Sequence, residues 1–217
     1  CKLLADALGK KRAGRMARSV RNRARALADV RALDVCLEMA RKEGAGPWLT
    51  GGLKKLRGKS LRAARPAFEA GKRRGLFRHL RRDIAGCGIP EKPAGAARKI
   101  LKKREKEWDR RRRAALHAPH LGSRWHRLRI AGKKWRYALE ESHALGFLPS
   151  PEPAKALKKL QSALGAAHDE EVLRGWIRNF ARGKGHDRRR EARTLVRKSN
   201  KRIARSLKTA RGMLNGI

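Results

Sequence analysis

Four potentially cationic side chains recur at helical spacing between residues 123 and 141. They are His126, Arg129, Lys133 and Arg136. At about 100° per residue of an α-helix, they lie within about 80° of one another along about 15 Å of helix. Guanidinium groups donate forked hydrogen bonds to oxyanions, whereas an ammonium group is a mobile point charge. The pattern predicts either an anion-binding site or a solvated helix face, and the pattern alone leaves both open.

The opposite side of this segment is apolar, which predicts that the helix packs against a core. Trp125 and Tyr137 could flank the cationic row, but core packing is the better interpretation of both. Glu140 follows Arg136 by four residues, so we expect it to orient that arginine. The apolar strip comprises Leu128, Trp135 and Leu139, with Ala131 and Ala138 at its edge.

The charge of the whole chain points to a polyanionic partner. Its 217 residues include 59 Lys or Arg against 19 Asp or Glu, a net charge of +40. Such an excess repels itself unless bound anions offset it, so the partner should be nucleic acid, an inorganic polyanion or an anionic membrane surface. No apolar run approaches the about 20 residues that span a bilayer. We expect no membrane span, a cytoplasmic location and, from the Arg, Ala and Gly content, a bacterial source.

Residues that could hold a metal are scattered. Cys1, Cys36 and Cys87 lie far apart without a Cys-x-x-Cys pair, which favours a reducing compartment over a disulfide framework. His117 and His120 have metal-like spacing but no accompanying ligand set. The chain also lacks a phosphate-binding loop with the G-x-x-x-x-G-K-[ST] pattern and a G-x-S-x-G elbow. We therefore expect no metal site, no cofactor and no catalytic residue.

The composition favours an all-α fold, because Ala, Leu, Arg and Lys dominate and β-branched residues are sparse. The densest cluster of helix breakers, residues 86–94, is expected to link a first helical half at 1–85 to a second at 95–217. Short joints in the second half predict a four-helix bundle. The expected helices are 15–42, shorter helices within 49–85 interrupted near Gly58, Pro66 and Gly71–Gly75, and then 95–116, 122–145, 153–181 and 187–214.

The first and last of these helices each combine a basic row with an apolar seam. Both rows are candidate anion contacts, although for each residue a solvated face is at least as good an interpretation. The basic rows are Arg18, Arg21 and Arg25 in the first helix, and Arg193, Arg197 and Lys201 in the last, where Arg189 and Arg205 extend the row. The seams are Val20, Leu27, Val30 and Leu37 in the first helix, and Val196, Ile203, Leu207 and Leu214 in the last.

A weak internal repeat relates the two halves. Leu27–Val35 aligns with Leu164–Val172, which pairs Arg31 with His168. In this register the counterpart of His126 would precede residue 1. We therefore expect the first half to lack its equivalent of the basic helix.

Two segments resemble the CHAD family, named for a conserved histidine α-helical domain. The signature helix of the family is matched by His126, Leu128, Arg129, Ile130, Lys133, Lys134, Arg136, Tyr137, Leu139 and Glu140. A second family element is matched by Leu160–Gly165 with His168–Asp169 and Val172–Leu173, and its first-half version by Arg31–Val35, where Ala32 replaces a carboxylate.

The resemblance implies two helical bundles related by a pseudo-twofold repeat, with a basic cavity that binds inorganic polyphosphate without catalysis. It also implies a role in targeting to polyphosphate stores or granules. By the resemblance and the stripe geometry, the ligands would be His126, Arg129, Lys133, Lys134 and Arg136. Two other functions stay open. A nucleic-acid-binding protein fits the charge but lacks a recognition motif, and a polyphosphate-metabolising enzyme would need a carboxylate cluster.

Overall fold

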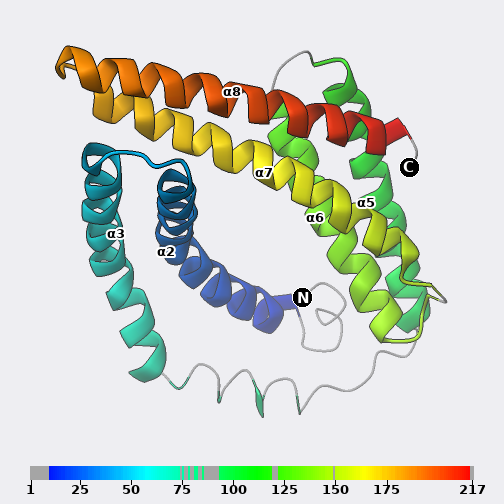
Figure 1. The fold of residues 1–217 in the computed structure, drawn as a ribbon. Helices are drawn as coiled ribbons and strands as arrows, with labels where there is room; N and C mark the ends of the chain where they lie inside the picture. The colour runs from blue at the N-terminus through cyan, green and yellow to red at the C-terminus, as the bar shows by residue number, and fades with distance from the viewer. Residues whose placement is uncertain are drawn as a thin grey trace. The chain divides into compact units, whose positions relative to one another are not determined.

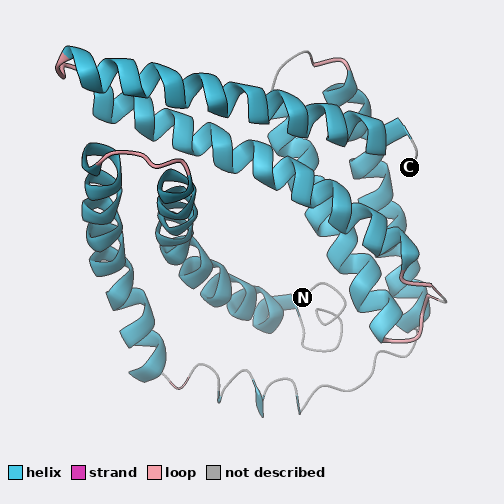
Figure 2. Ribbon diagram, viewed as in Figure 1, coloured by secondary structure: helices cyan, strands magenta, loops and turns pink. Residues whose placement is uncertain are grey.

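The structure is a computed structural model that describes residues 10–73, 75, 78, 81–82, 85, 93–118, 122–148 and 150–215. Within these residues the chain forms helices joined by loops and no strand, as Figures 1 and 2 show. The predicted all-α class is confirmed for this part of the chain. The helices are α2 (Lys10–Lys42), α3 (Pro47–Arg73), α5 (Pro93–Leu116), α6 (Ser123–Ala144), α7 (Glu152–Ala181) and α8 (His186–Asn215).

The chain divides into two compact units, Cys1–Pro93 and Ala94–Ile217. The first unit contains α2 and α3, and the second contains α5 to α8. Most of the predicted linker, residues 86–92, lies outside the described residues, as do Cys1, Cys87 and His120. The linker and its exact limits stay predictions.

In the first unit, α2 and α3 form a helical hairpin (Figure 1). The chain reverses at Gly44, whose φ of 66° is a left-handed conformation that glycine adopts readily. Leu33 of α2 and Leu53 of α3 are buried in the seam. The predicted apolar seam of α2 is half right, because Val30 and Leu37 are buried, whereas Val20 and Leu27 are 50% and 38% exposed.

The structure corrects two of the predicted interruptions in the segment 49–85, those at Gly58 and Pro66, whereas α3 does end within Gly71–Gly75. Helix α3 runs through Gly58 and Pro66 to Arg73 without a break. Proline removes one backbone hydrogen bond inside a helix and crowds the preceding turn, which is why Pro66 suggested a helix end. Pro66 is exposed, so water can satisfy the carbonyl that it leaves without a donor. Burial of one face of α3 against α2 outweighs the local cost.

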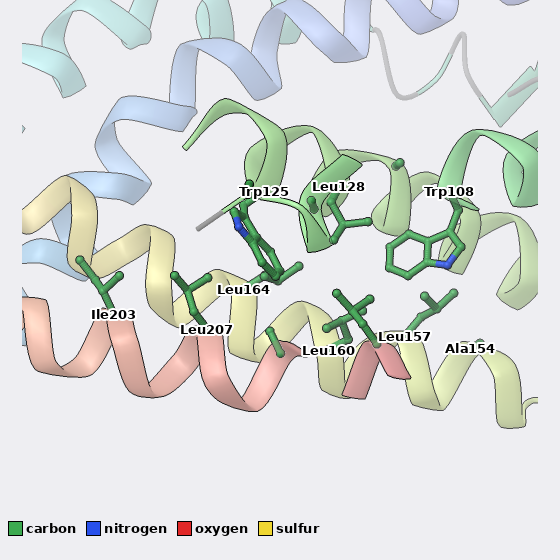
Figure 3. Packing of buried hydrophobic residues seen from close by; sticks show 14 of the residues in the cluster. Trp108, Trp125, Leu128, Ala154, Leu157, Leu160, Leu164, Ile203 and Leu207 are labelled. Carbon is green, nitrogen blue, oxygen red and sulfur yellow. The ribbon is translucent and has the colours of Figure 1, made fainter. Parts of the chain in front are cut away.

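The second unit is built around one hydrophobic cluster to which all four helices contribute. Trp108 comes from α5, and Trp125 and Leu128 come from α6. Figure 3 shows these side chains beside the leucines of α7 and the apolar residues of α8. Leu128 is fully buried, and Trp135 is partly buried against the cluster. The apolar strip of α6 is therefore confirmed as a core face. From α7 and α8 the cluster takes Ala154, Leu157, Leu160 and Leu164, and Ile203, Leu207, Ala210 and Leu214.

Helix α6 approaches α5 closely at Gly132, which is buried in the middle of the helix. A Cβ atom at this position would lie 2.8 Å from Cζ3 of Trp108. Trp108 is itself 1% exposed, and its ring centroid lies 5.7 Å from that of Trp135. The absence of a side chain at Gly132 thus makes room for a large indole ring, and this contact fixes α6 against α5.

Helices α7 and α8 run side by side, and their hairpin extends beyond the ends of α5 and α6 (Figure 1). A buried polar cluster joins the two helices. Arg202 donates to the carboxylate of Glu170 at 3.1 Å, and the Ser199 hydroxyl donates to the Glu170 carbonyl at 3.1 Å. Glu170 is only 5% exposed, so this pairing specifies how the two helices align along the hairpin.

The burial pattern of α7 follows the internal repeat. Val30, Leu33, Cys36 and Ala40 are buried in α2, and their counterparts in the predicted register, Ala167, Glu170, Leu173 and Ile177, are buried in α7. The match is partial, because Leu27 is exposed whereas its counterpart Leu164 is buried, and the register stays a prediction. The pseudo-twofold relation between the halves stays a prediction.

Candidate anion-binding site

The cationic row of α6 lies along its contact with α7. We call His126, Arg129, Lys133 and Arg136 the α6 stripe. The side chain of Arg136 is only 16% exposed. Its Nε donates to Oε1 of Gln161 on α7 at 3.0 Å, and its Nη1 donates to Oε1 of Glu140 at 2.6 Å. The predicted Arg136–Glu140 pair is therefore present.

At the other end of the stripe, two histidines and an arginine meet across the α6–α7 contact. The ring centroids of His126 and His168 lie 5.6 Å apart. Nε of Arg129 is buried and has no hydrogen-bond partner among the described residues. The lining of this small pocket, which we call the histidine pocket, comprises Gly122, Trp125, His126, Arg129, Leu164, His168 and Glu171.

The charges around the pocket act against one another. Burial, followed by the like charges of Arg129 and Arg136, lowers the pKa of Lys133 below its usual value of 10.5. Burial also lowers the pKa of His168 below 6.5, and Arg129 and His126 add to this effect. Asp169 opposes both shifts, and Glu171 opposes the shift at His168. Repulsion among the cations and the loss of hydration thus lower the two pKa values by more than the nearby carboxylates raise them.

A partly buried cluster of like charges raises the free energy of the folded protein without ligand. A bound anion would offset this increase. The α6 stripe offers a guanidinium fork at Arg129, an ammonium group at Lys133 and a histidine at the exposed edge. Arg136 is fixed by Gln161 and Glu140, so it contributes a rigid positive charge beside the others. The arrangement suits a ligand with several oxyanions in a row.

The lowered pKa of His168 predicts a pH-dependent stability in the absence of ligand. The unfolded chain takes up a proton near pH 6.5, whereas the folded protein does so only at lower pH. The unfolded state therefore binds more protons below pH 6.5, and stability falls as the pH drops through this range. His168→Gln should lose less stability than wild type between pH 7 and pH 5, as measured by the urea midpoint. The matched control is His186→Gln, an exposed histidine at the start of α8. An equal loss in His168→Gln and wild type would contradict the assignment.

The other predicted ligands are distributed over several surfaces. Lys134 is exposed on α6 next to the stripe. Arg193 and Arg197 line a groove between α7 and α8, and Lys201 is exposed further along α8. Arg18, Arg21 and Arg25 are exposed on α2 in the first unit. The structure thus brings together the α6 stripe in one place and Arg193 with Arg197 in another.

Two residues of the site were not predicted as ligands or positioning groups, and one core assignment was wrong. His168 appeared as the repeat counterpart of Arg31 and in the second family element, and Gln161 appeared only in that family element. Both lie on the face of α7 that meets α6, which a single-helix pattern does not reveal.

Tyr137 is 47% exposed rather than in the core, with the Arg136 guanidinium 4.4 Å from its ring centroid. Trp125, by contrast, is 1% exposed, as expected.

The described part of the chain offers neither a metal site nor a membrane-spanning helix. No group of three or more His, Cys, Asp or Glu side chains there is placed to hold a metal ion. None of its helices combines the length and apolar character that crossing a bilayer requires.

Comparison with known proteins identifies one family. The family model for the CHAD domain matches residues 1–178, which include α2, α3, α5, α6 and nearly all of α7. The match therefore contains the whole α6 stripe and both histidines of the pocket. No curated protein and no solved structure matches the chain.

Proposed function

This chain belongs to the CHAD domain family, and we propose that it binds inorganic polyphosphate through the α6 stripe and the histidine pocket. CHAD domains are known in general to bind polyphosphate and generally act as binding domains rather than catalysts. Polyphosphate is a flexible chain of oxyanions without bases to stack on or edges to read. Its receptor needs cations along a track, and the stripe supplies such a track.

The observation that supports this proposal most strongly is the repulsive cluster at the α6–α7 contact. Arg129 and Lys133 are partly buried beside Arg136, and each raises the free energy of the others. A face that only keeps the protein soluble needs no such burial. Bound phosphates would supply the acceptor that Nε of Arg129 lacks and would favour the charged forms of Lys133 and His168.

The wider role that we propose is retention at polyphosphate stores in the cytoplasm. A non-catalytic domain with +40 net charge can hold an attached protein on a polyanionic particle by many contacts at once. The remaining basic rows, Arg18, Arg21 and Arg25 on α2 and Lys134 on α6, are proposed to extend the electrostatic field around the chain.

The proposal is tested by calorimetric titration of the purified protein with long-chain polyphosphate at about 0.15 M salt, where exposed charges are well screened. We expect saturable binding, with polyphosphate recovered intact and no orthophosphate released. Absence of binding under these conditions would overturn the proposal. Release of orthophosphate would replace it with an enzymatic function.

A further inference from the structure

A second basic site lies on the α7–α8 hairpin, away from the histidine pocket. It is an open groove of about 500 Å³ between the last turns of α7 and the first half of α8. Pockets that bind small ligands in proteins have volumes of this order. The lining comprises Arg178, Ala181, Arg182, Gly183, Arg189, Ala192, Arg193, Val196, Arg197 and Asn200. We call it the arginine groove.

Among the described residues, the guanidinium groups of the five groove arginines form no side-chain hydrogen bond or ion pair, although the backbone N–H groups of Arg182 and Arg189 donate to Asn179 and Gly185. Their neighbours behave differently. Arg174 donates to Asn200 at 2.8 Å, and Arg202 pairs with Glu170. Residues 172–186 contain no acidic residue, and neither Asp187 nor Glu191 of α8 lines the groove. The arginines that join the two helices thus have partners within the protein, whereas the groove guanidinium groups are available to an external anion.

The groove and the histidine pocket share one face of α7. Around that helix, four residues lie within about 80° of one another: His168, Glu171, Gly175 and Arg178. Arg182 follows directly after the last residue of α7. His168 and Glu171 line the histidine pocket, whereas Arg178 and Arg182 line the groove. The distance along α7 from His168 to Arg178 is about 15 Å, from ten residues at a rise of about 1.5 Å each.

The surface between the two sites is open. Gly175 lies between Glu171 and Arg178, and a Cβ atom added there would meet nothing within 4 Å apart from the backbone of its own helix. The one acidic group on this path, Glu171, is held between His168 Nδ1 and Arg174 Nη2, at 3.9 Å from each. The Arg174 guanidinium therefore compensates part of the Glu171 charge, and an anionic chain can pass over Gly175 from one site to the other.

We propose that the arginine groove binds a second segment of the same phosphate chain that occupies the α6 stripe, so that the protein selects chains long enough to reach both sites. This inference rests on the proposed polyphosphate function. Once one segment is bound, the second binds intramolecularly at a high effective concentration. Tripolyphosphate is too short to bridge the two sites, so it gains nothing from the second.

The test compares tripolyphosphate with long-chain polyphosphate on matched variants. Arg193→Ala with Arg197→Ala removes two groove cations, and both positions are exposed on a helix that tolerates alanine. The control, Arg205→Ala with Lys208→Ala, removes the same charge from exposed positions of α8 outside the groove. Relative to the control, the groove variant should bind long chains about tenfold more weakly and tripolyphosphate equally well. Equal long-chain affinities in the two variants, or equal losses for both ligands, would overturn the inference.

A second pair of variants tests the path without touching either site. Gly175→Glu places a carboxylate between them and should lower long-chain affinity several-fold without changing tripolyphosphate affinity, whereas Gly175→Ala should bind like wild type. An unchanged long-chain affinity in Gly175→Glu would contradict a continuous path. If wild type binds neither ligand, the proposed function fails. If wild type binds polyphosphate while the groove and path variants match their controls, only this inference fails.

Discussion

Replacing Arg129 and Lys133 with alanine together should weaken the binding of long-chain polyphosphate by about 100-fold. Hydrogen bonds to charged groups contribute on the order of 1.5 kcal/mol each, and about 1.4 kcal/mol corresponds to a factor of ten in affinity. Arg129 holds a buried Nε without a partner, and Lys133 is partly buried beside two arginines. Both changes relieve repulsion in the free protein, so the variant should fold normally.

The matched control for this variant lies on the same helix. Arg124→Ala with Arg127→Ala removes two exposed cations from the other side of α6. Arg127 donates hydrogen bonds to Ser123, one turn earlier. If both double variants lose affinity equally, the protein responds to net charge alone. If the stripe variant folds and binds as tightly as wild type, the α6 stripe is not the site. Arg129→Lys then separates the requirement for a guanidinium fork from that for a positive charge.

Trp108→Ala should destabilise the protein by about 3–5 kcal/mol, the usual cost of removing a fully buried tryptophan. Trp108 is 1% exposed and packs against Trp135 and Gly132 at the α5–α6 contact. A loss of this size is a large part of the stability of a typical domain. The measurement is urea unfolding. Trp176→Ala is the control, because Trp176 is half-buried and stacks only on Phe180, so the same change should cost less.

Gly132→Ala tests the same contact from the other helix. Alanine favours a helix by about 1 kcal/mol over glycine, so the change would stabilise an unconstrained position. Here the new Cβ would lie 2.8 Å from a buried ring that cannot move aside, and we expect net destabilisation. Gly165→Ala is the control, since no atom lies within 4 Å of its added Cβ. Trp108→Phe should restore tolerance of Gly132→Ala, and stabilisation by Gly132→Ala alone would show that the contact does not constrain α6.

Helix α6 shows what sequence periodicity can establish. Its limits, its core face and its cationic row all follow from local spacing, because one helix repeats every 3.6 residues whatever surrounds it. The residues 122–145 were expected to be helical, and Ser123–Ala144 are. Local reasoning was less successful in the first unit. Pro66 and Gly58 are helix-breaking signals, yet packing of α3 on α2 overrides both.

The parts of the site that the sequence did not predict depend on contacts between helices. His168 and Gln161 become part of it only because α7 packs on α6 at the level of His126 and Arg136. Arg178 and Arg182 join Arg193 and Arg197 only because the turn between α7 and α8 brings them to the same groove. The residue pattern of one helix does not determine how that helix is aligned along a neighbouring helix. The exposure of Tyr137 likewise depends on which face of α6 its neighbours leave uncovered.

The most direct test of polyphosphate recognition is a competition titration at about 0.15 M salt. Labelled duplex DNA is bound first, and long-chain polyphosphate or unlabelled DNA is added at equal phosphate concentration. Non-specific binding to any polyanion follows counterion release and falls steeply with salt. We predict that polyphosphate displaces the DNA at a concentration at least tenfold lower than unlabelled DNA does, and that Arg129→Ala with Lys133→Ala abolishes this preference. Equal displacement by both polymers would contradict a polyphosphate site. It would leave only a general attraction between a chain of net charge +40 and any polyanion.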